Sequence, residues 1–164
     1  MSPDADPALP GAPPVEDARG HRFCLVAARY HEAAVARLVD AATQLLRRHG
    51  AAADDLETVW VPGALELPLA CQWVAASGKF DAVIALAVIL RGETEHFRLV
   101  ADQSAAGLAR VALDTGVPVL NGVLAAHHPG QIADRTGGIH GNRGAEAALA
   151  AIRMARLRRE RGAR

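Results

Sequence analysis

The chain has 164 residues, of which 51% are hydrophobic, and its 18 acidic and 18 basic side chains leave no net charge at neutral pH. A chain of this length is expected to form one domain with a good-sized core. Because the charges balance, no overall field attracts nucleic acid or an anionic membrane. No apolar stretch approaches the ~18 residues of a membrane span. We therefore expect neither nucleic acid nor membrane as a partner.

Residues 1–20 differ in composition from the rest of the chain. They hold five of the nine prolines together with four acidic side chains, a composition that cannot bury a core, so we expect a flexible arm. They also lack the basic region and the apolar core of a secretion signal. Cys24 and Cys71 each lie within an apolar run, which is typical of core residues in a reducing compartment. We therefore expect a cytoplasmic protein.

From residue 21 onward, apolar runs alternate with helical spacings. Strands are predicted at residues 23–28, 57–61, 82–90 and 117–123, and helices at about 35–46, 69–74, 97–112, 131–136 and 144–161. Strands separated by single helices need crossover connections, so the sheet is expected to be parallel and covered on both faces. The predicted fold class is α/β, a three-layer α/β/α sandwich around a four-stranded parallel sheet, flavodoxin-like in type.

This domain is expected to span residues 21–158, with a basic tail at residues 159–164. A solvated last helical turn accounts for the tail better than nucleic-acid binding does, because cations suit the end of a helix. The polar segments that interrupt the pattern, at residues 28–31, 62–66, 91–96 and 125–128, each follow a strand. The carboxyl ends of parallel strands meet at one edge of a sheet, where ligands bind. The sequence therefore predicts one site at that edge.

Residues 88–97 carry the most chemistry. The apolar run breaks at Arg91-Gly92, and helical spacing resumes at Phe97. Free amide groups at a helix start bind anions, Thr94 adds a hydroxyl, and His96 adds a group that titrates near neutrality. This pattern predicts phosphate binding beside an acid–base residue. Taken alone it is not specific, because such junctions occur in most α/β proteins and a histidine in a first helical turn is commonly a solvated surface residue.

Several blocks together resemble the lumazine synthases, which catalyse the penultimate step of riboflavin biosynthesis. The blocks are residues 60–68, 91–97, 121–124, 134–135 and 141–144. The resemblance implies the condensation of 5-amino-6-ribitylaminouracil with 3,4-dihydroxy-2-butanone 4-phosphate. The products would be 6,7-dimethyl-8-ribityllumazine, phosphate and water, and this transferase reaction would need no cofactor and no metal. The resemblance also implies a homopentamer with sites between neighbouring subunits. A sixty-subunit icosahedral shell that encloses riboflavin synthase is a further expectation.

The resemblance also implies roles for individual positions. His96 matches the catalytic acid–base residue, and Tyr30 matches the aromatic residue that stacks on the pyrimidine. The expected substrate-binding residues are Tyr30, Gly63, Ala64, Leu65, Glu66, Val88, Ile89, Leu90 and Asn121. The expected phosphate-binding residues are Arg91, Gly92, Glu93, Thr94 and, from the adjacent subunit, Arg135. The expected supporting residues are Asp134, Arg143 and Glu146, of which Glu146 would orient the histidine.

The sequence also departs from the family pattern. Asn121 stands where many relatives carry an aromatic residue, and Ile139 stands where a lysine is common. His127 and His128 replace a Thr-x-Glu-type segment, and because they lack a matched third ligand we expect no metal site. The departures keep a second interpretation open. In that interpretation the chain is a flavin- or lumazine-binding or shell-forming paralogue with weak or no turnover.

Overall fold

The computed structural model describes residues 16–162, so most of the expected N-terminal arm and the last two residues lie outside the described part of the chain. The central sheet comprises β1 (Phe23–Ala28), β2 (Leu56–Val61), β3 (Ala82–Leu90) and β4 (Val119–Ala126). All of its strand pairs are parallel, and the order is β2-β1-β3-β4. The prediction of a four-stranded parallel sheet is confirmed.

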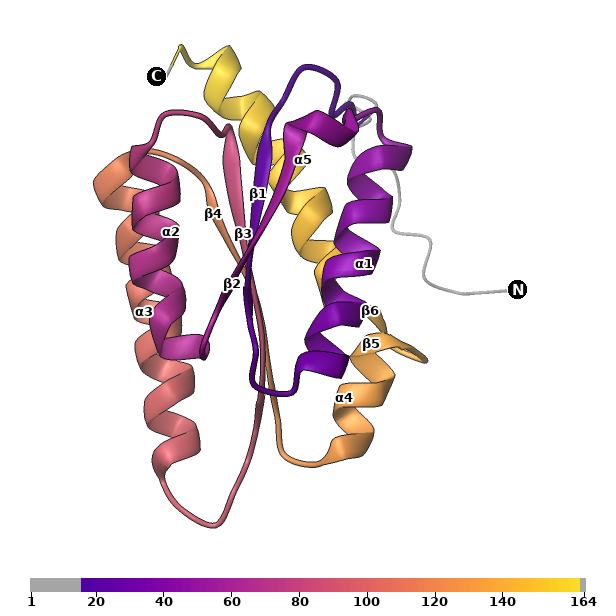
Figure 1. The fold of residues 1–164 in the computed structure, drawn as a ribbon, viewed down its shortest axis with the longest axis vertical. Helices are drawn as coiled ribbons and strands as arrows, with labels where there is room; N and C mark the ends of the chain where they lie inside the picture. The colour runs from indigo at the N-terminus through magenta and orange to yellow at the C-terminus, as the bar shows by residue number, and fades with distance from the viewer. Residues whose placement is uncertain (1–15, 163–164) are drawn as a thin grey trace, which may run out of the picture.

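Helices cover both faces of the sheet (Figure 1). One face carries α1 (Glu32–Arg48), α5 (Arg143–Glu160) and the short α4 (Pro129–Arg135), and the other carries α2 (Leu67–Ala76) and α3 (His96–Thr115). Two single 3-10 turns, η1 (Ala53–Asp55) and η2 (Ala64–Glu66), flank β2. A small antiparallel pair, β5 (Thr136–Gly138) and β6 (Gly141–Asn142), joins α4 to α5. The three-layer α/β/α arrangement is therefore confirmed.

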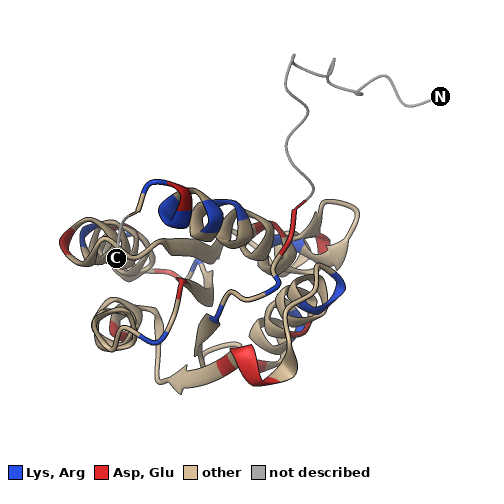
Figure 2. Cartoon of the chain, turned by 90° about the horizontal axis from the view of Figure 1, so that it is seen from above, with Lys and Arg blue, Asp and Glu red and all other residues tan. Residues whose placement is uncertain are grey.

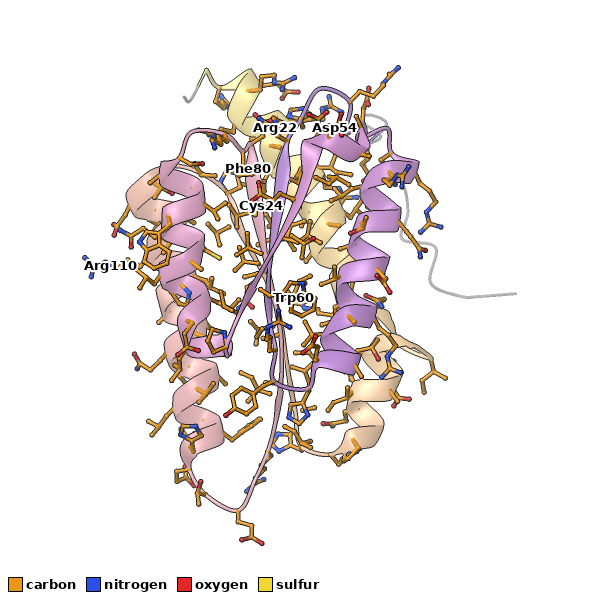
Figure 3. All side chains as sticks on the ribbon, viewed as in Figure 1. Arg22, Cys24, Asp54, Trp60, Phe80 and Arg110 are labelled. Atoms are coloured by element: carbon orange, nitrogen blue, oxygen red, sulfur yellow. The ribbon has the colours of Figure 1, made fainter. Side chains whose placement is uncertain are left out.

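The uninterrupted apolar runs form strands that are buried on both faces. Along β1, Phe23 and Leu25 face the α1–α5 side, whereas Cys24 and Val26 face the α2–α3 side, and all four are fully buried. Parallel strands covered on both faces read as continuous apolar sequence for this reason. Cys24 lies deep between these layers (Figure 3), and burial raises its thiol pKa to about 12. It is a core residue, as the sequence predicted.

Close helix packing depends on a small residue at the start of α5. A Cβ atom added at Gly144 would collide with the backbone of Leu38, including its carbonyl oxygen. Glycine at this position lets α5 rest directly on α1. Asn142 caps the same helix, because its side-chain oxygen accepts from the amides of Gly144 (2.8 Å) and Ala145 (3.2 Å).

Several element bounds differ from the sequence prediction. The fourth strand runs to Ala126 rather than to residue 123, because it stays in register with β3 as far as the pair Leu90 and Ala126. The α4 helix begins at Pro129, which suits a first helical position because that residue needs no amide donor. The β5–β6 pair was not predicted. It depends on the positive φ angles of Gly137 (116°) and Gly141 (73°).

The two ends of the described chain are more firmly packed than the expected arm and tail. Ala18 is fully buried, and its amide donates to the carbonyl of His49 at 2.8 Å. The carboxylate of Glu16 forms an ion pair with Arg153 of α5. At the other end, α5 continues to Glu160, so the expected domain boundary at residue 158 falls inside a helix. Residues 16–20 are therefore held against the domain, and residues 159–160 belong to its last helix.

Charged side chains of both signs are carried mainly by the helices and loops (Figure 2). At the amino ends of the strands, the guanidinium of Arg22 lies 5.7 Å from the centre of the Phe80 ring (Figure 3). Within residues 16–162, no helix is long and apolar enough to cross a membrane.

Candidate active site

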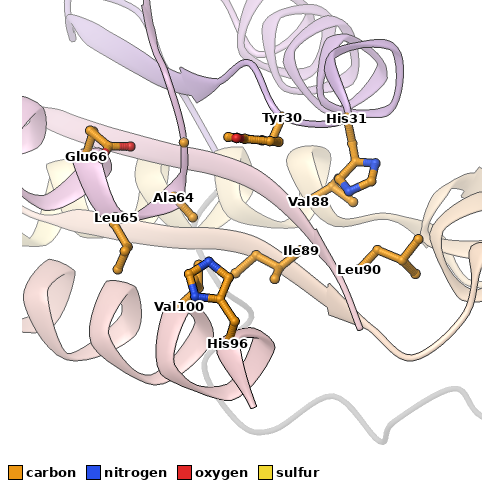
Figure 4. A pocket seen from close by; sticks show the side chains of 11 residues that line it. Tyr30, His31, Ala64, Leu65, Glu66, Val88, Ile89, Leu90, His96 and Val100 are labelled. Carbon is orange, nitrogen blue, oxygen red and sulfur yellow. The ribbon is translucent and has the colours of Figure 1, made fainter. Parts of the chain in front are cut away.

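The loops that follow the strands gather at one edge of the sheet, at the bottom of Figure 1. A pocket of about 360 Å³ lies there. Its walls come from the loop after β1, from η2, from the end of β3 and from the first turns of α3 (Figure 4). The lining residues are Tyr30, His31, Gly63, Ala64, Leu65, Glu66, Val88, Ile89, Leu90, His96 and Val100. The pocket therefore contains His96 and all the predicted substrate-binding residues except Asn121.

Tyr30 forms one wall of the pocket. Its ring is 72% exposed, so its face is accessible to a planar ligand. The loop that carries Tyr30 is held in place, because the amide of Arg29 donates to the Val61 carbonyl at 2.9 Å. The guanidinium of Arg29 also lies 5.3 Å from the centre of the Trp60 ring. The loop that carries the ring of Tyr30 is thus held by contacts with β2.

Gly63 allows Tyr30 and Glu66 to approach each other. A Cβ atom at Gly63 would stand 3.1 Å from Oε2 of Glu66 and 3.3 Å from Cδ2 of Tyr30. Both distances are shorter than ordinary van der Waals contact, so a larger residue would push one of the side chains aside. Glycine therefore keeps an aromatic ring and a carboxylate together at this wall.

The end of β3 provides the floor of the pocket. Val88 and Ile89 are 2% and 8% exposed, respectively, and Leu90 is only partly buried. These side chains give the pocket an apolar base. They are available to it because β3 continues past the end of β1 and ends level with β4. The backbone beyond Leu90 continues into the loop that leads to α3.

His96 is the first residue of α3, and its ring points into the pocket from the side opposite Tyr30 (Figure 4). The loop before it contains Arg91, Gly92, Glu93 and Thr94, all of which are exposed. The amide of Arg91 donates to the carbonyl of Ala126 at 2.8 Å. The helix begins at His96, within one residue of the predicted start, and the predicted phosphate-binding residues form the loop in front of it.

The remaining predicted residues lie on other elements and do not line this pocket. Asn121 belongs to β4, and its backbone carbonyl accepts from Nη2 of Arg143 at 3.2 Å. Nη1 of Arg143 also pairs with Glu146 at 3.2 Å, in the first turn of α5. Asp134 and Arg135 lie at the end of α4. Within one chain, Glu146 therefore contacts Arg143 rather than the pocket that contains His96.

Two pocket residues were missed by the sequence reasoning. His31 adopts a left-handed backbone conformation (φ 56°, ψ 43°), the one positive φ at a non-glycine residue within residues 16–162. Its carbonyl accepts from the amides of Ala34 (2.9 Å) and Val35 (3.1 Å), which start α1. Such strained backbone is common at ligand sites, but no glycine or asparagine signalled it here. Val100 follows His96 by one helical turn, and helical spacing could have placed it on the same face.

No group of three or more His, Cys, Asp or Glu side chains is placed to hold a metal ion within residues 16–162. His127 contacts Arg91, with 3.4 Å between Nδ1 of the histidine and Nη1 of the arginine. His128 precedes α4 as its N-cap residue. The two adjacent histidines therefore have separate local roles.

The fold and the pocket together define a class of protein. A parallel α/β sheet has a mostly apolar pocket at its carboxyl edge, and a histidine and a polar loop lie beside that pocket, as in α/β enzymes that act on small molecules. The family model for 6,7-dimethyl-8-ribityllumazine synthase matches residues 20–159. A relative named 6,7-dimethyl-8-ribityllumazine synthase, from Halorhodospira halophila (strain DSM 244 / SL1), is 48% identical over 139 residues, which cover 85% of this chain and 89% of that protein. The chain belongs to the 6,7-dimethyl-8-ribityllumazine synthase family, and the resemblance found in its sequence is confirmed.

Proposed function

We propose that the pocket between Tyr30 and His96 is the site at which this chain performs the reaction of its family. As a member of that family, the chain is a transferase of riboflavin biosynthesis that acts on small molecules and forms 6,7-dimethyl-8-ribityllumazine. It does so by condensing 5-amino-6-ribitylaminouracil with 3,4-dihydroxy-2-butanone 4-phosphate. The observation that carries the site assignment is that Tyr30, Glu66 and His96, from three separate segments, face one pocket.

The planar pyrimidine is proposed to lie against the ring of Tyr30. Stacking on an exposed aromatic face suits a flat heterocycle, and the backbone at Val88 and Ile89 would hold its polar edge. Ala64 and Glu66 would contact the ribityl chain, whose hydroxyl groups suit a carboxylate acceptor. Gly63, Leu65 and Leu90 complete this part of the pocket.

The phosphate is proposed to lie at the loop formed by Arg91, Gly92, Glu93 and Thr94. Exposed residues at a helix start and the hydroxyl of Thr94, which accepts from the His96 amide at 3.4 Å and can donate to a ligand, favour an anion there. The lining of the described pocket includes no lysine or arginine, so a dianion would gain from a further cation. We propose that Arg135 of an adjacent subunit supplies it, bidentately.

His96 is proposed as the acid–base residue. The amine of the pyrimidine attacks the ketone to give a carbinolamine, which loses water to form an imine. Phosphate is then eliminated, and the resulting enol tautomerises to a second carbonyl. The ribitylamino nitrogen attacks this carbonyl, and loss of a second water closes the ring. Each step moves a proton, and a positioned histidine typically contributes ~10²–10⁴-fold to such steps. Holding two reactive substrates together contributes more, so His96 accelerates a reaction that positioning makes possible.

The assembly is proposed to be a homopentamer in which each pocket is completed by a neighbour. Trp73 on α2 and Leu113 on α3 are 67% and 86% exposed, respectively, and such side chains favour burial against another copy. Asn121, Asp134 and Arg135 lie outside the pocket of their own chain, which fits a contribution to the next one. Arg143 and Glu146 would support that side of the site. A sixty-subunit shell that encloses riboflavin synthase, in the cytoplasm, extends the same proposal.

Turnover by the purified full-length chain tests the proposed function. Both substrates are supplied together with a metal chelator, and lumazine is followed by its absorbance. Lumazine should form without added metal or cofactor. Tight binding of the pyrimidine or of lumazine without turnover would instead support the paralogue interpretation, which the exposed Ile139 in place of a cation keeps open.

A further inference from the structure

His127 directly follows β4 and lies beside the loop proposed to bind phosphate. The register of β3 and β4 pairs Leu90 with Ala126, the last residue of each strand. Arg91 and His127 are therefore the first residues beyond two adjacent strand ends. The amide of Arg91 donates to the Ala126 carbonyl at 2.8 Å, which keeps the two segments together.

The ring of His127 touches both ends of this loop. On one side, Nη1 of Arg91 lies 3.4 Å from Nδ1 of His127. A guanidinium can only donate, so Nδ1 is the acceptor in this contact. On the other side, the ring packs against Phe97 of α3, with 5.6 Å between ring centres and an interplanar angle of 48°. His127 thus bridges the start of the loop and the helix that follows it.

The backbone of His127 is itself fixed. Its amide donates to Oε1 of Gln131 in α4 at 2.7 Å. The histidine therefore links the β4–α4 connection to the neighbouring loop, through its amide on one side and its ring on the other. Because an imidazole nitrogen carries no negative charge, the contact orients Arg91 without neutralising its charge, which leaves the guanidinium available to an anion.

We propose that His127 is a positioning residue for the phosphorylated substrate: it acts through Arg91, with its ring held against Phe97, rather than by touching the substrate. This inference rests on the proposed function, in which the loop from Arg91 to Thr94 binds the phosphate. It assigns a role to a histidine that otherwise looks like a surface residue. The pyrimidine side of the pocket, at Tyr30 and Glu66, lies on other elements and does not depend on this contact.

Steady-state kinetics of the full-length protein test this role. His127→Ala should raise KM for the phosphorylated butanone about 3- to 10-fold, the effect of losing one typical hydrogen bond, and change KM for the pyrimidine less than about twofold. His127→Gln, whose amide oxygen can accept from Arg91, should recover most of the loss. His128→Ala is the matched control and should behave as the wild type.

A double-mutant cycle separates positioning from direct contact. If His127 acts through Arg91, the Arg91→Ala/His127→Ala protein should be no worse than Arg91→Ala alone. Additive losses in the double variant, equal rises in both KM values, or an unchanged His127→Ala protein would overturn the proposal.

Binding of inorganic phosphate, measured by calorimetry, gives a readout that does not need turnover. His127→Ala should bind it more weakly by a similar factor, and equal affinity would count against the proposal. Absence of turnover in the wild type, by contrast, would contradict the proposed function. The role of His127 would then be tested by phosphate binding alone.

Discussion

The ring of His96 enters the pocket from the first position of α3, a place that supplies chemistry without supporting the core. His21 has the opposite setting. It is 3% exposed, lies at the amino ends of the strands and packs against Phe23, with 6.3 Å between ring centres. One histidine is available to substrates and the other is part of the folded interior. Substitution of His96 should therefore change turnover and leave stability intact, whereas substitution of His21 should change stability.

Replacing His96 by alanine should lower turnover and leave folding intact. The expected loss in kcat is about 10²-fold or more, because the residue supplies proton transfer while positioning remains. The thermal unfolding midpoint should stay within about 1 °C of the wild type, since surface substitutions change stability little. His128→Ala is the control. Unchanged kcat in the His96 variant would remove this residue from its proposed role.

The buried His21 should make stability depend on pH. Burial lowers its pKa below the ordinary 6.5, the cation of Arg159 lowers it further with a smaller effect from Arg156, and Asp81 and Asp17 act in the opposite direction. The folded protein therefore holds the ring neutral while the unfolded chain takes up a proton below about pH 6.5. The stabilisation is complete above that pH and is lost as the pH falls.

The measurement is the unfolding midpoint of the wild type and of His21→Leu between about pH 8 and pH 5.5, the range over which a histidine changes charge. The wild type should lose stability more steeply on acidification than the variant. Absolute stability is not compared, because the substitution also alters packing. Parallel pH profiles for the two proteins would mean that folding does not lower the pKa of His21.

At the scale of elements, the central strands were predictable because burial on both faces leaves continuous apolar sequence, as in β1 and β3. The β5–β6 pair was not, because its short strands depend on glycines at positive φ and on the surrounding helices. The left-handed His31 escaped prediction for a related reason, since the fold rather than the residue type imposes it. The pocket itself was predictable from the polar segments that follow β1, β2 and β3, whereas the segment that follows β4 does not line it.

The cap of α5 gives a prediction at this scale. Asn142→Ala should lower the free energy of unfolding by about 1 kcal/mol, because two amides at the helix start lose their acceptor. Asn142→Ser keeps an acceptor and should retain most of the stability. Urea unfolding monitored by circular dichroism measures both variants. Equal losses in the two proteins would assign the effect to the contact between Nδ2 of Asn142 and the Arg37 carbonyl at 3.3 Å.

At the scale of the whole molecule, one chain brings together only part of the proposed site. The wall at Tyr30, the floor at Val88 and the histidine belong to one pocket, whereas Arg135 stands at the end of α4 outside it. The sequence resemblance implied that Arg135 comes from the adjacent subunit, and Arg135 does not line the pocket of its own chain. The proposed explanation is a ring of subunits in which each chain completes the pocket of its neighbour.

Complementation between two impaired variants tests directly whether the site is shared between subunits. His96→Ala and Arg135→Ala proteins are each assayed alone and after co-expression in equal amounts, with mixed oligomers verified by native mass spectrometry. If the site is shared, up to about a quarter of wild-type turnover should return, because a random ring pairs an intact His96 with a neighbour's intact Arg135 at that frequency. His96→Ala mixed with the double variant is the control and should stay inactive. Mixed pentamers with no recovered turnover, or a monomeric wild type with full activity, would contradict the account.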